Sequence, residues 1–184
     1  MARSFGGERI RLYYFCRNQQ HMDHQLHQED PTPPDCFRLE ELEALQTFEN
    51  QLLVQVNYYL WTDQAADSVS LRRFLFFLEL VFDDQRSLLL SSGEDTEAIR
   101  VSSAETLVKT AEALRALHNR IVIQRVTAEE LPLWAAVQGK ILSAIQLSKN
   151  AQGLHTNDAL LLNFNDQQII VRLSRQEGLE VGPY

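Results

Sequence analysis

The chain has 184 residues, of which 45% are hydrophobic and 23% charged, and its formal net charge is −8. This length suits a single domain (1–184) that buries a sizeable core without covalent staples. The negative net charge argues against a surface that binds nucleic acids or anionic membranes in general. Two cysteines give no disulfide framework, and the first twenty residues contain no apolar run of signal length. We therefore expect a cytoplasmic protein that does not enter a membrane.

Residues 8–17, ERIRLYYFCR, alternate in character and predict a β-strand. One face would be apolar, with Ile10, Leu12, Tyr14 and Cys16. The other face would be basic and aromatic, with Arg9, Arg11, Tyr13, Phe15 and Arg17. Cations interleaved with rings can bind a nucleic-acid backbone and its bases, although arginine stems covering an exposed strand are the simpler explanation in an acidic protein. This basic face is the candidate interaction surface.

Residues 18–34 are polar and contain three prolines, which predicts a mobile loop. The loop holds His21, His24 and His27, and Cys36 follows it. Imidazole and thiolate are zinc ligands. However, three histidines at steps of three residues cannot all lie on one helix face, since the third is rotated by about 120° from the first. The spacing also matches no standard zinc module. We therefore predict no bound metal or other cofactor, with a metal site in this loop as the alternative.

The region 35–153 is expected to form a helical bundle. Apolar residues at steps of three and four predict a first helix over 36–61. The second stretch, 70–90, includes FLFFLELVF, in which Glu79 is the single charge. Because it is apolar nearly all round, we interpret it as the central core helix, packed on several sides.

Two further helices are predicted from capping signals. Ser102 and Glu105 have capping-box spacing and begin the third helix. Residues 120–126, RIVIQRV, fit its end or a strand, and periodicity does not decide between them. Thr127 begins the fourth helix, which would end near Lys149.

The end of the chain changes to strand patterning. Residues 158–174 form two apolar runs around Asn165 and Asp166, which predicts a β-hairpin. With those two residues as the turn, Leu162 faces Ile169 and Leu160 faces Val171. Residues 8–17 are the expected third strand, and 179–181 are a possible fourth.

Glu79, His118 and Arg115 are the remaining candidate residues. A buried Glu79 would have a raised pKa unless a partner such as Arg115 or Arg120 compensated its charge. His118 lies one helical turn after Arg115, so the pair could serve acid–base chemistry, but a core histidine is the commoner explanation. No phosphate loop, dinucleotide fingerprint or nucleophile elbow is present.

The predicted fold class is therefore α+β and predominantly α, with about four helices around the 70–90 helix and a small antiparallel sheet. We expect a non-enzymatic protein-interaction or assembly subunit that binds another protein by strand addition or self-association. A small metal-dependent enzyme using the histidine loop is the first alternative. A nucleic-acid-associated regulator using the N-terminal arginines is the second.

Overall fold

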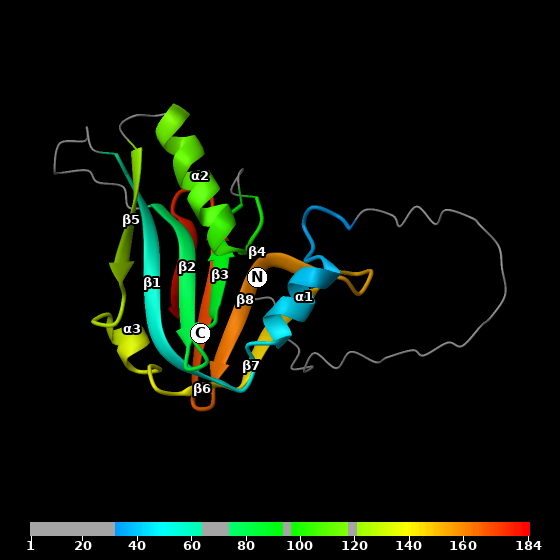
Figure 1. The fold of residues 1–184 in the computed structure, drawn as a ribbon. Coiled ribbons are helices and arrows are strands. Elements are labelled where there is room, and N and C mark those ends of the chain that lie inside the picture. Colours follow the sequence, from blue (N-terminus) through cyan, green and yellow to red (C-terminus); the bar gives the residue numbers. More distant parts are fainter. Residues whose placement is uncertain (1–31, 64–73, 94–96, 118–120) are drawn as a thin grey trace, which may run out of the picture.

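The computed structural model describes residues 32–63, 74–93, 97–117 and 121–184. This part of the chain is mostly β, with 51% of it in strands and 19% in helices, and a mixed sheet curls into a half-barrel (Figure 1). The predicted α-rich class and the helical bundle are wrong. In chain order, the elements are α1 (Leu39–Gln46), β1 (Gln51–Asp63), β2 (Phe74–Phe82), β3 (Ser87–Ser91), β4 (Arg100–Ser102), α2 (Ala104–Leu117), β5 (Ile121–Thr127), α3 (Pro132–Ala135), β6 (Ile141–Leu142), β7 (Ala144–Lys149), β8 (His155–Phe164), β9 (Gln167–Ser174) and β10 (Gly178–Pro183).

The sheet consists of two runs of neighbouring strands. One run is β5–β1–β2–β3–β4 and the other is β10–β9–β8–β7, each antiparallel throughout. The runs join where Gly178 of β10 pairs in parallel with Leu75 of β2. They also join through β6, which pairs with the start of β1 just before β7. The β1–β2 pairing has two register shifts, one with an extra residue in β1 at Val54 and one with an extra residue in β2 at Phe76. Such irregularities bend and twist a strand, which helps the sheet to curl.

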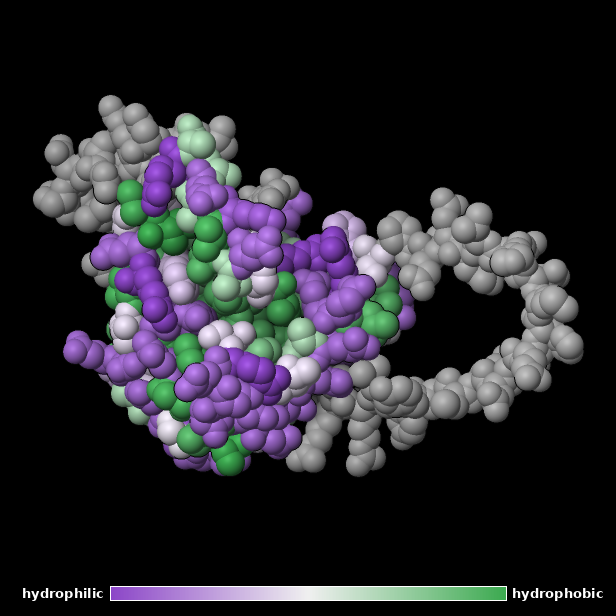
Figure 2. Space-filling view, in the orientation of Figure 1, coloured by the Kyte–Doolittle hydropathy of each residue, from purple (hydrophilic) through white to green (hydrophobic). Residues whose placement is uncertain are grey.

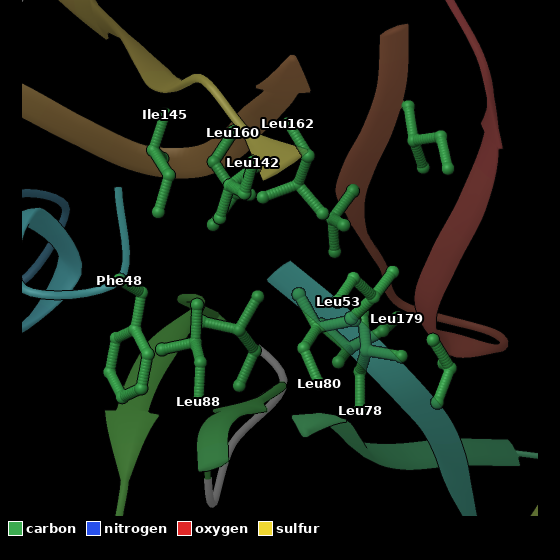
Figure 3. Close-up of a cluster of buried hydrophobic side chains, with 14 of the residues drawn as sticks. Phe48, Leu53, Leu78, Leu80, Leu88, Leu142, Ile145, Leu160, Leu162 and Leu179 are labelled. Carbon is green, nitrogen blue, oxygen red and sulfur yellow. The ribbon is translucent and has the colours of Figure 1, made fainter. Parts of the chain in front are cut away.

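The main core lies between the two runs of strands. Figure 3 shows Leu160 and Leu162 of the second run opposite Leu80 and Leu88 of the first. Phe48, which follows α1, and Trp134 of α3 belong to the same buried cluster. The half-barrel is therefore filled by side chains along most of its length.

A smaller core lies on the outer side of β2 and β3. Phe76, Phe77 and Leu89 are buried there, and Leu107 of α2 packs against them. Figure 1 shows α2 lying across these two strands. Trp61 and Phe74, both partly buried, pack against this cluster, and Figure 2 shows hydrophobic surface beside α2. Both faces of β2 are therefore covered.

This two-sided burial explains why the predicted central helix 70–90 is wrong. Residues 74–82 are β2 and residues 87–91 are β3, joined by a turn in which Gln85 has a φ of 64°. Leu78 and Leu80 face the main core, while Phe77 faces α2. A strand buried on both faces loses its alternation and becomes a continuous apolar run. Periodicity cannot distinguish such a run from a buried helix.

The predicted helix 36–61 is correct only for its first third. α1 ends at Gln46, Asn50 has a φ of 65°, and β1 occupies 51–63. The extra residue of β1 at Val54 shifts its alternation once, so the core-facing Leu53 and Val56 lie three positions apart, as they would in a helix. The segment VQVNYYLW is rich in β-branched and aromatic residues, which favour strands. Pairing with β2 and β5 therefore prevails over the local helical pattern.

The predicted fourth helix is also wrong. Its start, Thr127, is the last residue of β5, and α3 covers only Pro132–Ala135. Gly139, with a φ of 75°, then redirects the chain into β6 and β7. The segment 120–126, which sequence left open, forms β5 from Ile121 onward.

Two predictions are confirmed. The third helix is α2, although its cap lies one residue later than predicted: Ser102 ends β4, and Thr106 N–H donates to the Ser103 hydroxyl. The C-terminal hairpin is β8–β9 in the predicted register, with Leu160 opposite Val171 and Leu162 opposite Ile169. Asn165 in its turn has a φ of 58°, as two-residue hairpin turns require. The expected further strand is β10, whereas the expected strand 8–17 lies outside the described residues.

Candidate functional site

One side of the half-barrel is open, between β5 and β10. Among the described strands, β5 pairs with β1 alone. β10 pairs with β9 along one edge and meets β2 only at Gly178 on the other. Each strand therefore has an edge without a partner in the described structure, and we call the gap between them the seam. Unpaired strand edges offer backbone donors and acceptors to another chain.

The seam holds a pocket with a volume of about 320 Å³. Its floor comes from β1 and the start of β2, and its walls come from β5 with the following turn and from β10. The lining residues are Tyr58, Leu60, Leu75, Val126, Thr127, Ala128, Leu131, Glu177, Leu179, Glu180 and Val181. This volume is at the lower end of the range for ligand sites, and it suits one or two large side chains rather than an extended cofactor.

Tyr58 is the polar group of the pocket floor. The indole Nε1 of Trp134 donates a hydrogen bond of 2.7 Å to the Tyr58 hydroxyl oxygen. Burial raises the pKa of Tyr58, and the hydrogen bond from Trp134 partly opposes that shift. The phenol therefore remains protonated at neutral pH and keeps its O–H as a donor, rather than acting as a nucleophile or base.

The rim of the pocket combines exposed apolar side chains with carboxylates. Leu131 is 45% exposed and Val126 is 37% exposed. Glu177 and Glu180 lie exposed at the β10 wall. An occupant with an apolar side chain and a neighbouring positive charge would match this rim, because the carboxylates favour cations near a surface of low dielectric.

Glu79 lies on the outer face of β2 and has three partners on neighbouring strands. Its Oε2 accepts hydrogen bonds from Asn57 Nδ2 and Tyr59 Oη, both at 2.9 Å, and from Arg125 at 3.2 Å. The compensating partner is thus Arg125 of β5, whereas Arg115 is exposed on α2. The expected pairing of Glu79 with a cation from another element is confirmed, and the cation is Arg125, which the sequence analysis did not suggest. Such a satisfied network is typical of a structural carboxylate.

Most other residues singled out from the sequence lie outside the described residues. These are the interaction candidates Arg9, Arg11, Tyr13, Phe15 and Arg17, together with His21, His24, His27 and His118. Arg120, suggested as a partner of Glu79, also lies outside them. The structure therefore tests none of their proposed roles.

Cys36 is the one described member of the suggested metal site. Its side chain is fully buried, where Asn150 Nδ2 lies 3.6 Å from Sγ. Burial, followed by the charge and hydrogen bond of Asp35, raises the pKa of the Cys36 thiol. The thiol is therefore protonated at neutral pH and a poor nucleophile. Within the described ranges, no group of three or more histidine, cysteine or acidic side chains is arranged to hold a metal ion.

The seam residues could not be identified from the sequence. Tyr58 lies in an aromatic segment with Tyr59 and Trp61, and nothing in the sequence around it indicates its neighbours in the seam. Tyr58 and Glu180 are more than 120 positions apart. Tyr58 and Glu180 line one pocket only because the sheet curls.

No family model matches the chain, and no curated protein or solved structure does. The helices in the described part of the chain are all too short or too polar to cross a membrane.

Proposed function

We propose that this protein is a non-enzymatic interaction subunit of the cytoplasm whose seam binds an extended segment of a partner protein. The observation that carries the proposal is the apolar pocket between two strand edges that have no partner among the described strands. In strand addition, backbone hydrogen bonds supply affinity and pockets for alternate side chains supply specificity. The seam offers both elements side by side.

The chemistry of the rim specifies the kind of segment. Leu60 and Leu75 of the floor and Leu179 of the β10 wall offer apolar contacts for one side chain of the segment. Glu177 and Glu180 favour lysine or arginine at the flanking positions. The expected partner segment therefore alternates apolar and basic residues, as an added strand does when one face is buried.

The described chemistry supports binding rather than catalysis. Tyr58 has a raised pKa, and the thiol of Cys36 is buried away from the seam lining. A buried free cysteine also agrees with a reducing compartment. Self-association through the same edges is the version of this proposal in which the partner is a second copy.

The test uses two fluorescein-labelled peptides of ten residues, one alternating valine and lysine and the other alternating valine and glutamate. Fluorescence anisotropy measures their binding to the full chain at low and high salt. We expect the lysine peptide to bind, and the glutamate peptide to bind at least tenfold more weakly. A lysine peptide N-methylated on alternate residues should lose binding, since one of its edges cannot donate hydrogen bonds.

Matched variants locate the site. Leu131→Lys places a positive charge in the pocket rim, beside the lysines of the peptide, and should weaken lysine-peptide binding at least tenfold. Val108→Lys alters a similarly exposed side chain on α2 and should leave binding unchanged. Equal binding by the Leu131→Lys and parent proteins would refute the seam as the site. Binding of an apolar dye without either peptide would indicate a small-molecule pocket instead.

A further inference from the structure

Tyr58 brings a hydrogen-bond donor to the floor of the seam pocket. Its hydroxyl oxygen accepts from the indole Nε1 of Trp134 at 2.7 Å, and in the described part of the chain this is the one hydrogen bond of that hydroxyl. Trp134 is fully buried in the main core, whereas Tyr58 is partly buried and lines the pocket. A phenol oxygen can accept and donate at the same time. The Tyr58 proton is therefore available to an acceptor in the pocket.

The other polar side chains of the lining do not offer such a donor. The Thr127 hydroxyl donates to Asn57 Oδ1 at 3.5 Å. Glu177 and Glu180 are carboxylates, which only accept hydrogen bonds when ionised. Among the described residues that line the pocket, Tyr58 thus supplies the one side-chain donor without an acceptor of its own.

We propose that the side chain filling the seam pocket is a tyrosine of the partner segment, whose phenol oxygen accepts a hydrogen bond from the Tyr58 hydroxyl. This inference rests on the proposed function, because it names the anchor residue of the segment that binds at the seam. Tyr58 is then the residue that determines which side chain the pocket accepts.

The charges around the pocket require a neutral acceptor. Glu177 and Glu180 lie exposed at the β10 wall, and they would repel a carboxylate or phosphate on the occupant. A lysine or arginine side chain has only donors and offers nothing to the Tyr58 proton. The polar atom that reaches the floor is therefore an uncharged acceptor, while basic residues of the segment stay near the rim.

The apolar part of the lining selects a large side chain with a polar tip. Leu60, Leu75 and Leu179 line a pocket of about 320 Å³. Tyrosine combines a rigid apolar ring with a hydroxyl, and it is enriched at protein interfaces. Glutamine also carries a neutral acceptor, but its amide brings two donors that need partners. The phenol brings one donor, which Glu177, Glu180 or water can accept at the open side of the seam.

Binding to the parent protein tests the inference first. Four fluorescein-labelled peptides of ten residues alternate valine and lysine, and three of them carry one central tyrosine, phenylalanine or glutamine in place of valine. Fluorescence anisotropy measures their binding to the full chain. The tyrosine peptide should bind about fivefold more tightly than the phenylalanine peptide, since the two differ only in the hydroxyl that contacts Tyr58.

The four affinities separate this inference from the proposed function. Equal affinities of the tyrosine and phenylalanine peptides, or tightest binding by the glutamine peptide, would overturn the inference while the proposed function stands. Absence of binding by all four peptides would overturn both.

Matched variants assign the preference to Tyr58. In Tyr58→Phe, the affinities for the tyrosine and phenylalanine peptides should differ by less than about twofold. Because this variant leaves the Trp134 donor without a partner, the comparison is repeated in a Trp134→Phe background. Trp134→Phe alone should keep the preference for tyrosine, and the double variant should lose it. Binding of the valine peptide shows that the seam of each variant is intact, and a preference that survives loss of the Tyr58 hydroxyl in either background would overturn the inference.

Discussion

Trp134 and Tyr58 are joined by a hydrogen bond of 2.7 Å between the indole Nε1 and the phenol oxygen. Trp134 is fully buried in α3, and Tyr58 is part of the seam floor in β1. The contact therefore ties the short helix α3 to the strand that forms the bottom of the pocket. The indole has a single hydrogen-bond donor and no acceptor. The Tyr58 oxygen is the acceptor for that donor.

Tyr58→Phe should destabilise the protein by about 1–3 kcal/mol, because it leaves a buried donor without a partner. Urea unfolding followed by tryptophan fluorescence measures this loss. In a Trp134→Phe background the same substitution should cost clearly less, since no indole donor remains. Equal costs in the two backgrounds would mean that the hydrogen bond makes no net contribution.

Glu79 makes the fold sensitive to alkaline pH through Tyr59. Burial first, and then the hydrogen bond and charge of Glu79, raise the pKa of Tyr59 to about 12, against a small opposing effect of Arg125. The folded state therefore retains a proton that the unfolded state loses near pH 10, and the resulting stability is complete below pH 10 and lost as pH rises through 12. Glu79→Gln should move the pKa of Tyr59 toward 10 in an ultraviolet titration. An unchanged titration curve would contradict the assigned cause.

Gly178 controls the junction of the two runs of strands. It has a φ of 76°, and a Cβ there would overlap the Leu75 carbonyl oxygen. Gly178→Ala should therefore cost several kcal/mol of stability, through strain and loss of the single β10–β2 pairing. Gly182→Ala in the same strand is the control, because its Cβ would meet no atom within 4 Å. Thermal unfolding measures the melting temperatures of both variants. Similar values would contradict the role of Gly178 at the junction.

Leu78→Asp should abolish soluble folding. Leu78 is fully buried in the main core, and an unpaired buried charge costs several kcal/mol out of the roughly 5–15 kcal/mol that stabilise a domain. Val54→Asp, at a position 42% exposed in β1, should remain soluble. Circular dichroism and soluble yield compare the two variants, and a folded Leu78→Asp protein would show that β2 is not central.

The sequence by itself determined the elements whose signals are local. The hairpin register follows from alternation around Asn165 and Asp166, because a one-residue slip would expose Leu160 and Val171. α2 follows from its helical stripe, whereas its predicted cap was placed one residue too early. Glu79 could be singled out as one charge in an apolar run, but its partners could not, because Tyr59 and Arg125 are 20 and 46 residues away.

Only the tertiary structure decided whether the long apolar runs became helices or strands. Residues 74–82 are buried on both faces, so the period that distinguishes the two forms is absent from them. In β1, one extra residue at Val54 places Leu53 and Val56 at a helical spacing. The choice therefore lies in pairing between segments far apart in the chain. The seam pocket has the same origin, since Tyr58, Leu131 and Glu180 meet only when the sheet curls.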